Sequence, residues 1–196
     1  MPRVVAGKCR GIPLVTPKGD KTRPTADKVK EALFSILQNR LPDASFLDLF
    51  AGSGQMGIEA VSRGAKYAVL IDDNDFSAAA IAGNLSKTRL SDQIRHIKKD
   101  VFRSLQTLGD NKETYDIIFM DPPYASALAY SEKIAELICV TGLLKPDGLF
   151  IVEHSSLILP KKNVMNLTLS RRCIYGSTML TFYTTDTHYS GGILNT

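Results

Sequence analysis

Short apolar runs alternate with segments of helical periodicity in the middle of this chain, from residue 45 to residue 153. Apolar runs of this kind suit strands that are buried on both faces of a sheet. Strands joined by helices of this length pair in parallel through right-handed crossovers, with helices on both faces. The sequence therefore predicts an α/β fold with a doubly wound, mostly parallel sheet. The expected strands are 45–50, 66–71, 94–98, 115–120 and 148–153, and the expected helices are 55–63, 75–87, 101–108 and 127–141.

The two ends of the chain depart from this alternation. Near the N-terminus, Gly7 and Gly11 divide two short apolar stretches, which predicts a small β-hairpin. Near the C-terminus, a Tyr-Gly-Ser turn separates two apolar segments and predicts an antiparallel hairpin that completes the sheet. The expected elements are a hairpin within 3–16, a loop over 17–24, a helix over 26–39, and strands over 165–174 and 178–184.

Positive charge is concentrated near the N-terminus. Residues 1–30 hold eight cationic and two anionic side chains, or +6, whereas the whole chain carries +4, which leaves −2 for the rest. Clustered Lys and Arg side chains are typical of a surface that binds a phosphate backbone, although a solvated basic face gives the same pattern. The candidate contacts to such a backbone, in and beside this segment, are Arg3, Lys8, Arg10, Arg23, Pro24 and Thr25.

Composition and spacing exclude several other classes of protein. No apolar run approaches the ~20 residues of a membrane span, and the N-terminus lacks the apolar core of a secretory signal. The cysteines and histidines are scattered without the spacing of a disulfide framework or a metal site. We therefore expect a cytoplasmic protein without a metal and without a membrane partner. The residues concerned are Cys9, Cys139, Cys173, His96, His154 and His188.

A glycine-rich loop follows the first predicted strand. Gly52, Gly54 and Gly57 fit G-x-G-x-x-G between a strand and a helix, where the missing Cβ atoms let a ligand approach the backbone. Acidic residues at the end of the second strand can accept bonds from ribose hydroxyls. These features alone leave NAD and S-adenosylmethionine (SAM) both open. The cofactor-site candidates are Asp48, Phe50, Ala51, Gly52, Ser53, Gly54, Asp72, Asp73, Asp100 and Val101.

Two residues in this set have more specific interpretations. Asp48 lies just before the glycines, where it suits the cationic aminoacyl end of SAM and would repel a pyrophosphate. Asp100 follows the third strand and can accept a bond from an adenine amino group, or it can cap the next helix. The balance therefore favours SAM over NAD.

The sequence Asp121-Pro122-Pro123-Tyr124 directly follows the fourth predicted strand. Open α/β sheets bind ligands at this end of their strands. Two prolines remove two N–H donors and fix two φ angles, which leaves a stiff turn rich in acceptors. The Asp121 carboxylate, the Pro122 carbonyl and the Tyr124 ring suit a planar ligand with an amino group, such as a nucleobase. Asp121, Pro122 and Tyr124 are therefore the candidate catalytic residues.

The glycine loop and this turn resemble those of class I methyltransferases that act on exocyclic nitrogens. The N-terminal motifs Arg3-Val4-Val5-Ala6-Gly7-Lys8 and Thr22-Arg23-Pro24-Thr25-Ala26-Asp27 resemble the RsmD family of small-subunit ribosomal RNA guanine-N2 methyltransferases, and the similarity extends over about residues 2–185. The resemblance implies a Rossmann-like class I methyltransferase fold, SAM as cofactor, and methylation of N2 of the guanine at position 966 of 16S ribosomal RNA. It also implies that the partner is that RNA or the assembling small subunit.

The charge distribution, the resemblance and the chain terminus together divide the chain into three parts. A basic RNA-binding hairpin extension is expected over 1–24, the methyltransferase domain over 25–186, and a frayed tail over 187–196. Relatives often carry Glu where Asp72 stands, one methylene longer with the same acceptor role.

Other functions fit parts of the pattern. A DNA adenine-N6 or cytosine-N4 methyltransferase uses the same acceptor turn, but it commonly carries a sizeable recognition region. Protein glutamine methyltransferases usually have Asn where Asp121 stands. A non-catalytic RNA-binding module would not need both motifs, and a dehydrogenase would bind NADH. A peripheral substrate contact by Glu153 or His154, at the end of the fifth strand, stays open.

Overall fold

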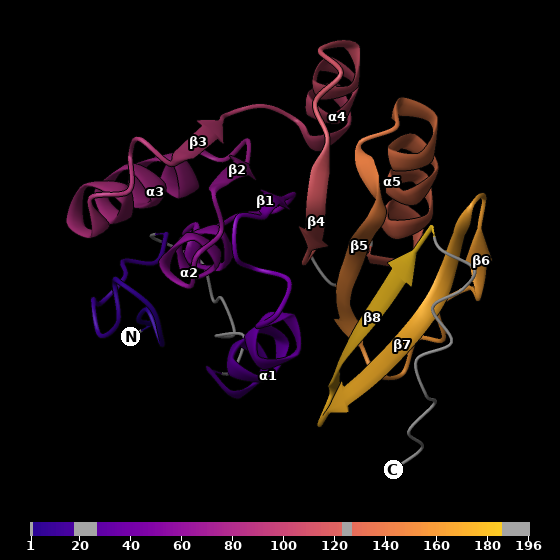
Figure 1. Ribbon diagram of the computed structural model, residues 1–196, viewed down its shortest axis with the longest axis horizontal. Helices are drawn as coiled ribbons and strands as arrows, with labels where there is room; N and C mark the ends of the chain where they lie inside the picture. Colours follow the sequence, from indigo (N-terminus) through magenta and orange to yellow (C-terminus); the bar gives the residue numbers. More distant parts are fainter. Residues whose placement is uncertain (1, 18–26, 123–126, 186–196) are drawn as a thin grey trace. The chain divides into compact units, whose positions relative to one another are not determined.

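The computed structural model describes residues 2–17, 27–122 and 127–185 (Figure 1). They form two compact units, which are divided in the sequence between Ser104 and Leu105. The described helices are α1 (Asp27–Leu37), α2 (Gln55–Ser62), α3 (Asp75–Thr88), α4 (Val101–Asp110) and α5 (Ala127–Thr141). Each of these helices was expected from the periodicity of the sequence, with bounds that differ by two residues at most.

The first unit contains three parallel strands. β1 (Ser45–Asp48), β2 (Tyr67–Ile71) and β3 (Ile94–Ile97) lie in the order β3-β2-β1. Leu47 pairs with Val69, which in turn pairs with Arg95, so the three strands end at the same edge. The loops that follow them therefore meet at this edge, where α/β sheets bind ligands.

Local chemistry sets the starts of the helices that follow these strands. Asn74 caps α3, because its side-chain oxygen accepts hydrogen bonds from the backbone N–H groups of Phe76 at 2.7 Å and Ser77 at 3.3 Å. α2 begins instead at Gly54, which has a left-handed backbone and no side-chain cap. The N-terminus of α2 therefore follows directly from the glycine turn.

The N-terminal segment pairs with itself but forms no regular strands in its described part, residues 2–17. A single antiparallel bridge joins Arg3 and Pro13, with Val4 N–H donating to Ile12 O at 3.0 Å and Gly11 N–H donating to Val4 O at 2.8 Å. The prediction of a hairpin is therefore confirmed in that the chain reverses direction here, and it is wrong in that the two arms form a single bridge and no strands. Pro13 lacks an N–H donor, which limits the ladder at that side.

Hydrogen bonds to α2 hold this segment in place. The Glu59 side chain is fully buried and accepts from the N–H groups of Val5 at 2.8 Å and Ala6 at 3.0 Å. Ser62 Oγ accepts from Cys9 N–H at 2.9 Å, and Ser62 O accepts from Lys8 N–H at 2.8 Å. Buried side-chain acceptors and one backbone carbonyl of α2 thus take the place of a β-ladder for these backbone donors.

The second unit contains a mixed sheet. Its strands are β4 (Tyr115–Met120), β5 (Leu144–Ser155), β6 (Asn163–Val164), β7 (Leu167–Tyr175) and β8 (Thr178–Thr184), in the order β4-β5-β8-β7-β6. β4 and β5 are parallel, whereas β5, β8, β7 and β6 pair antiparallel. The β7–β8 hairpin turns at Gly176, which has φ +62, and confirms the predicted C-terminal hairpin (Figure 1).

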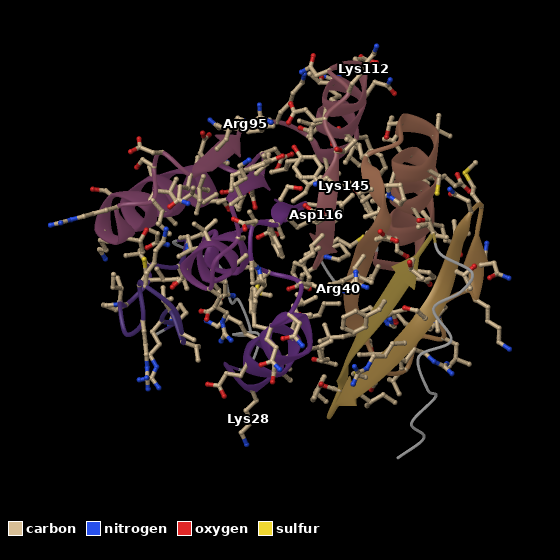
Figure 2. All side chains as sticks on the ribbon, in the orientation of Figure 1. Lys28, Arg40, Arg95, Lys112, Asp116 and Lys145 are labelled. Atoms are coloured by element: carbon tan, nitrogen blue, oxygen red, sulfur yellow. The ribbon has the colours of Figure 1, made fainter. Side chains whose placement is uncertain are left out.

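Two features of this sheet were not predicted. β5 begins at Leu144 rather than 148, and its register with β4 shifts between Tyr115 and Ile117, so Pro146 and Gly148 lie in the irregular part. β6 is only two residues long and has no periodic pattern. Beside the irregular part, the ammonium of Lys145 lies 2.7 Å from the carboxylate of Asp116 on β4 (Figure 2).

Aromatic pairs mark the core of each unit. Phe34 on α1 stacks with Phe46 on β1 at a centroid distance of 6.4 Å, and Phe150 on β5 stacks with Tyr183 on β8 at 6.0 Å. Such pairs contribute to stability beyond the apolar area that they bury.

In the described residues, no helix has the length and apolarity to cross a membrane. The expected α/β class is confirmed.

Candidate active site

The glycine loop forms a tight turn at the carboxyl end of β1. Gly52 has φ +53 and Gly54 has φ +76, and Gly54 N–H donates to Ala51 O at 2.7 Å. A Cβ built on Gly52 would meet nothing within 4 Å, whereas one on Gly54 would lie 2.9 Å from Leu70 Cδ1. Gly52 therefore leaves open space beside its backbone, as a ligand that lies against the loop requires.

Gly57 has a different role from the other two glycines. A Cβ there would lie 2.3 Å from Leu70 Cδ2, so this position allows α2 to pack closely on β2. The same fingerprint thus combines a glycine with open space beside its backbone and a packing glycine, a division of roles known from nucleotide-binding α/β folds.

Asp72 connects the end of β2 to this loop. Its Oδ2 accepts from Gly52 N–H at 2.8 Å, and its Oδ1 accepts from Asn74 N–H at 3.0 Å. The side chain is half-buried, and each carboxylate oxygen keeps a further acceptor site. Asp72 is therefore a loop anchor that still has lone pairs for ribose hydroxyls. Its neighbour Asp73 is exposed.

Asp48 is the last residue of β1, and only 1% of its surface is exposed. A carboxylate at this depth favours a cationic neighbour, because burial penalises the charged form. The aminoacyl ammonium of SAM is a cation of this kind. In the sequence just after it, Ala51 and Ser53 are buried and Phe50 is half-buried, so they can contribute walls or backbone to the site.

Asp100 caps α4. Its Oδ1 accepts from Arg103 N–H at 3.1 Å, and its carbonyl accepts from Ser104 N–H at 2.9 Å. The capping alternative is thus observed, and contact with adenine stays a prediction. The carboxylate is exposed and Val101 beside it is buried, so the pair offers a polar atom next to an apolar surface.

One residue that the sequence did not assign to the site touches the glycine loop. The fully buried amide nitrogen of Asn84 donates to Ser53 O at 2.9 Å and to Val15 O at 2.9 Å, and its oxygen accepts from Val15 N–H at 2.8 Å. Asn84 on α3 therefore joins the loop to the N-terminal segment. The feature of the sequence that could have pointed to Asn84 is its position as a polar residue on the buried face of an amphipathic helix.

In the second unit, Asp121 and Pro122 follow β4 directly. Asp121 is half-buried and Pro122 is buried. Desolvation raises the pKa of Asp121 to about 6. Pro123 and Tyr124 lie outside the described residues, so the stacking role expected for Tyr124 stays a prediction.

Glu153 and His154 lie on β5, the neighbour of β4. Burial and the charge of Asp121 raise the pKa of Glu153 to about 8. His154 is held inside the sheet, because its Nε2 lies 2.8 Å from Thr181 Oγ1 and its Nδ1 lies 2.9 Å from Ser155 O. Desolvation lowers the pKa of His154. These contacts give His154 a structural role, whereas Glu153 lies close enough to Asp121 for the charge of Asp121 to help raise the pKa of Glu153.

The described candidates for RNA contact lie on the surface of the first unit. Arg3, Lys8 and Arg10 are exposed, and Lys28 projects from the start of α1 (Figure 2). Lys30 differs from them, because it is fully buried, donates to Arg3 O at 2.7 Å and lies 4.0 Å from Glu59. The basic surface is therefore smaller than the count of charges suggests. The other three candidates, Arg23, Pro24 and Thr25, lie outside the described residues.

Comparison with known proteins identifies the family of the chain. The family model "Conserved hypothetical protein 95" matches residues 2–184. Proteins named "Ribosomal RNA small subunit methyltransferase D" from Haemophilus influenzae and Escherichia coli are each 34% identical over 151 residues, which is 77% of this chain and 77% and 73% of theirs.

The fold also matches a solved structure over nearly the whole chain. A hypothetical protein from Thermus thermophilus is 30% identical and superposes with a TM-score of 0.81, over 94% of this chain and 99% of its own. The glycine loop and its acidic neighbours fit the expected cofactor. The chain belongs to the family that the Conserved hypothetical protein 95 model describes, the RsmD family, and is a SAM-dependent methyltransferase.

Proposed function

We propose that this enzyme methylates the exocyclic N2 of a guanine in 16S ribosomal RNA. The observation that carries the proposal is the Asp121-Pro122 turn directly after a parallel strand, in a chain whose relatives are named for ribosomal RNA small subunit methylation. The turn supports an amino group as the acceptor of the methyl group, and the names of the relatives support ribosomal RNA as the substrate. The guanine at position 966 follows from the resemblance of the sequence motifs.

Residues of the first unit would hold the cofactor. The open backbone at Gly52 and the acceptors of Asp72 suit a ribose-bearing ligand, and the buried Asp48 suits its ammonium group. When bound, SAM supplies a methyl group already activated on a sulfonium. The protein's task is therefore mainly to position the acceptor nitrogen.

Asp121 and Pro122 would perform that positioning. The Asp121 carboxylate and the Pro122 carbonyl accept the two N2 hydrogens, which favours a pyramidal nitrogen with an available lone pair. Asp121 takes the proton that nitrogen loses on methylation, and a weak base suffices because the nitrogen is then cationic. Tyr124 would stack on the base. The guanine has to be unstacked to reach this turn.

The N-terminal segment would contact the RNA backbone. Arg3, Lys8 and Arg10 expose cationic side chains on a segment held firmly by Glu59. Phosphate contacts of this kind position a protein without reading sequence. This role matches the proposed extension over 1–24, and a ribosomal substrate implies action in the cytoplasm, on 16S RNA or the assembling small subunit.

Transfer of label to RNA tests this function. The protein is incubated with labelled SAM and unmodified small-subunit particles, with naked 16S RNA and duplex DNA in parallel, and the labelled nucleotide is mapped. Label on N2 of one guanine is the expected result. Label in DNA would support a DNA methyltransferase instead, and RNA binding without label would support a non-catalytic module.

A further inference from the structure

Two carboxyl groups are brought together by the register of β4 and β5. Phe119 pairs with Ile151 and Met120 pairs with Val152, so the next step along both strands sets Asp121 beside Glu153. Side chains of paired residues in neighbouring strands point to the same face of a sheet. Asp121 and Glu153 therefore share one face.

That face is the one opposite α5. The alternate residues of β5, Phe150, Val152 and His154, line a cavity together with Ser131 and Ala135 of α5. Side chains alternate between faces along a strand, so Glu153 points away from that helix. The carboxyl group belongs to the side of the sheet that Asp121 also faces.

Glu153 is buried deeply for an acidic residue. Only 4% of its surface is exposed, and its Oε2 has no hydrogen-bond partner among the described residues. Across the sheet β8 sets apolar Leu180 opposite it, and Ile151 and Ser155 are its neighbours on the same face of β5. In the described part of this unit, Asp121 is the charged group acting on Glu153. An isolated buried carboxyl is far more stable in its neutral form.

The ionisation of the pair follows from this surrounding. Burial together with the charge of Asp121 raises the pKa of Glu153 to about 8, and burial raises the pKa of Asp121 to about 6. Two interacting carboxyls lose their protons in two separate steps. Between these two values the pair therefore carries one proton and one negative charge.

We propose that Glu153 is a positioning residue for methyl transfer, because it retains the single proton of the pair and leaves Asp121 as the ionised acceptor. The inference rests on the proposed function. In the step, a bond forms between N2 and the methyl carbon, the S–C bond breaks, and its electron pair stays on sulfur. N2 then gives a proton to Asp121, which releases it to solvent, while Glu153 keeps its own proton throughout.

Loss of that proton disrupts the site. Two adjacent anions, one buried and one half-buried, repel each other, so Asp121 is driven from its alignment with the Pro122 carbonyl when Glu153 ionises. The reactive form is then bounded on both sides, by protonation of Asp121 below about pH 6 and by ionisation of Glu153 above about pH 8. Turnover is expected to follow a bell-shaped profile.

The pH profile of turnover in Glu153→Gln tests the proposal. Gln is neutral at every pH, so the variant is expected to keep the acid limb and lose the alkaline limb, with a decrease in kcat of roughly 3- to 10-fold at pH 7 from altered hydrogen bonding. Glu132→Gln is the matched control, since this α5 carboxylate pairs with Lys161, and both limbs should persist. An alkaline limb that survives in Glu153→Gln overturns the proposal.

Stability measurements separate this proposal from the proposed function, because they need no substrate. The pKa of Glu153 is raised from 4.5, so its contribution to folding is complete below about pH 4.5 and is lost as the pH rises through about 8. The free energy of unfolding of the native protein should therefore fall relative to Glu153→Gln over this range. If the difference in free energy of unfolding between the native protein and Glu153→Gln does not change with pH, the inference is contradicted, even if RNA methylation is found.

Discussion

The side-chain amide of Asn84 donates to the carbonyl of Ser53 at 2.9 Å, which links helix α3 to the glycine loop. The same amide group makes two hydrogen bonds with the backbone of Val15. One buried side chain thus fixes the loop that would hold SAM and the segment that would contact RNA.

Replacement of Asn84 should loosen both. Asn84→Ala removes the partners of buried backbone groups at Ser53 and Val15, so we expect a loss of stability of about 2–3 kcal/mol. The dissociation constant of SAM should rise as the loop becomes less ordered. Chemical denaturation and calorimetric titration measure the two effects. Ser86→Ala, an exposed change on the same helix, is the control, and an equal response of both variants would contradict the role of Asn84.

Two glycines of one motif should respond differently to the same change. Gly52→Ala has open space for its methyl group but a φ of +53, so it should cost about 1–2 kcal/mol in stability and weaken SAM binding by obstructing the backbone. Gly57→Ala drives a methyl group toward Leu70, so it should mainly destabilise the fold. Melting temperatures and SAM titrations of the two variants provide the comparison. If the two variants lose SAM affinity in the same proportion to their loss of stability, Gly52 does not lie beside the ligand.

Asp121 is expected to be needed for turnover and not for cofactor binding. Asp121→Ala should abolish methyl transfer while SAM still binds, because the cofactor candidates all lie in the other unit. In the native enzyme, kcat should fall as the pH drops through about 6, since protonation of Asp121 removes the acceptor. Single-turnover assays over pH 5–8 measure this limb. Turnover within a few-fold of the native rate in the variant would refute the assigned role.

The exposed cations of the N-terminal segment should set the salt dependence of RNA binding. Changing Arg3, Lys8 and Arg10 together to Gln removes three exposed charges, so the slope of log K against log salt should become shallower by up to about 2–3. Binding titrations of 16S RNA at several salt concentrations measure the slope. The control is Lys112→Gln, an exposed change after α4 in the other unit (Figure 2), which should leave the slope nearly unaltered. An unchanged slope in the triple variant would show that the segment is a solvated basic surface that does not bind RNA.

Local pattern was enough to predict most of the elements. β4 and α5 were predicted with the bounds that they have, because a buried strand and an amphipathic helix are each encoded by neighbouring residues. β5 was predicted to begin four residues too late and to end two residues too early. The late start arises because Pro146 and Gly148 are strand breakers, whose effect is absorbed by a register shift against β4. The two residues of β6 carry no period, and pairing with β7 alone makes them a strand.

The sequence by itself determined the α/β class, the glycine loop, the acceptor turn and the family, because residues that are contiguous or regularly spaced encode each of these features. Only the tertiary structure decided that Lys30 is buried against Glu59, that Asn84 joins the loop to the N-terminal segment, and that Glu153 lies beside Asp121. These relationships join residues distant in the chain. Burial and strand register, which set their charge states and partners, exist only after the chain has folded.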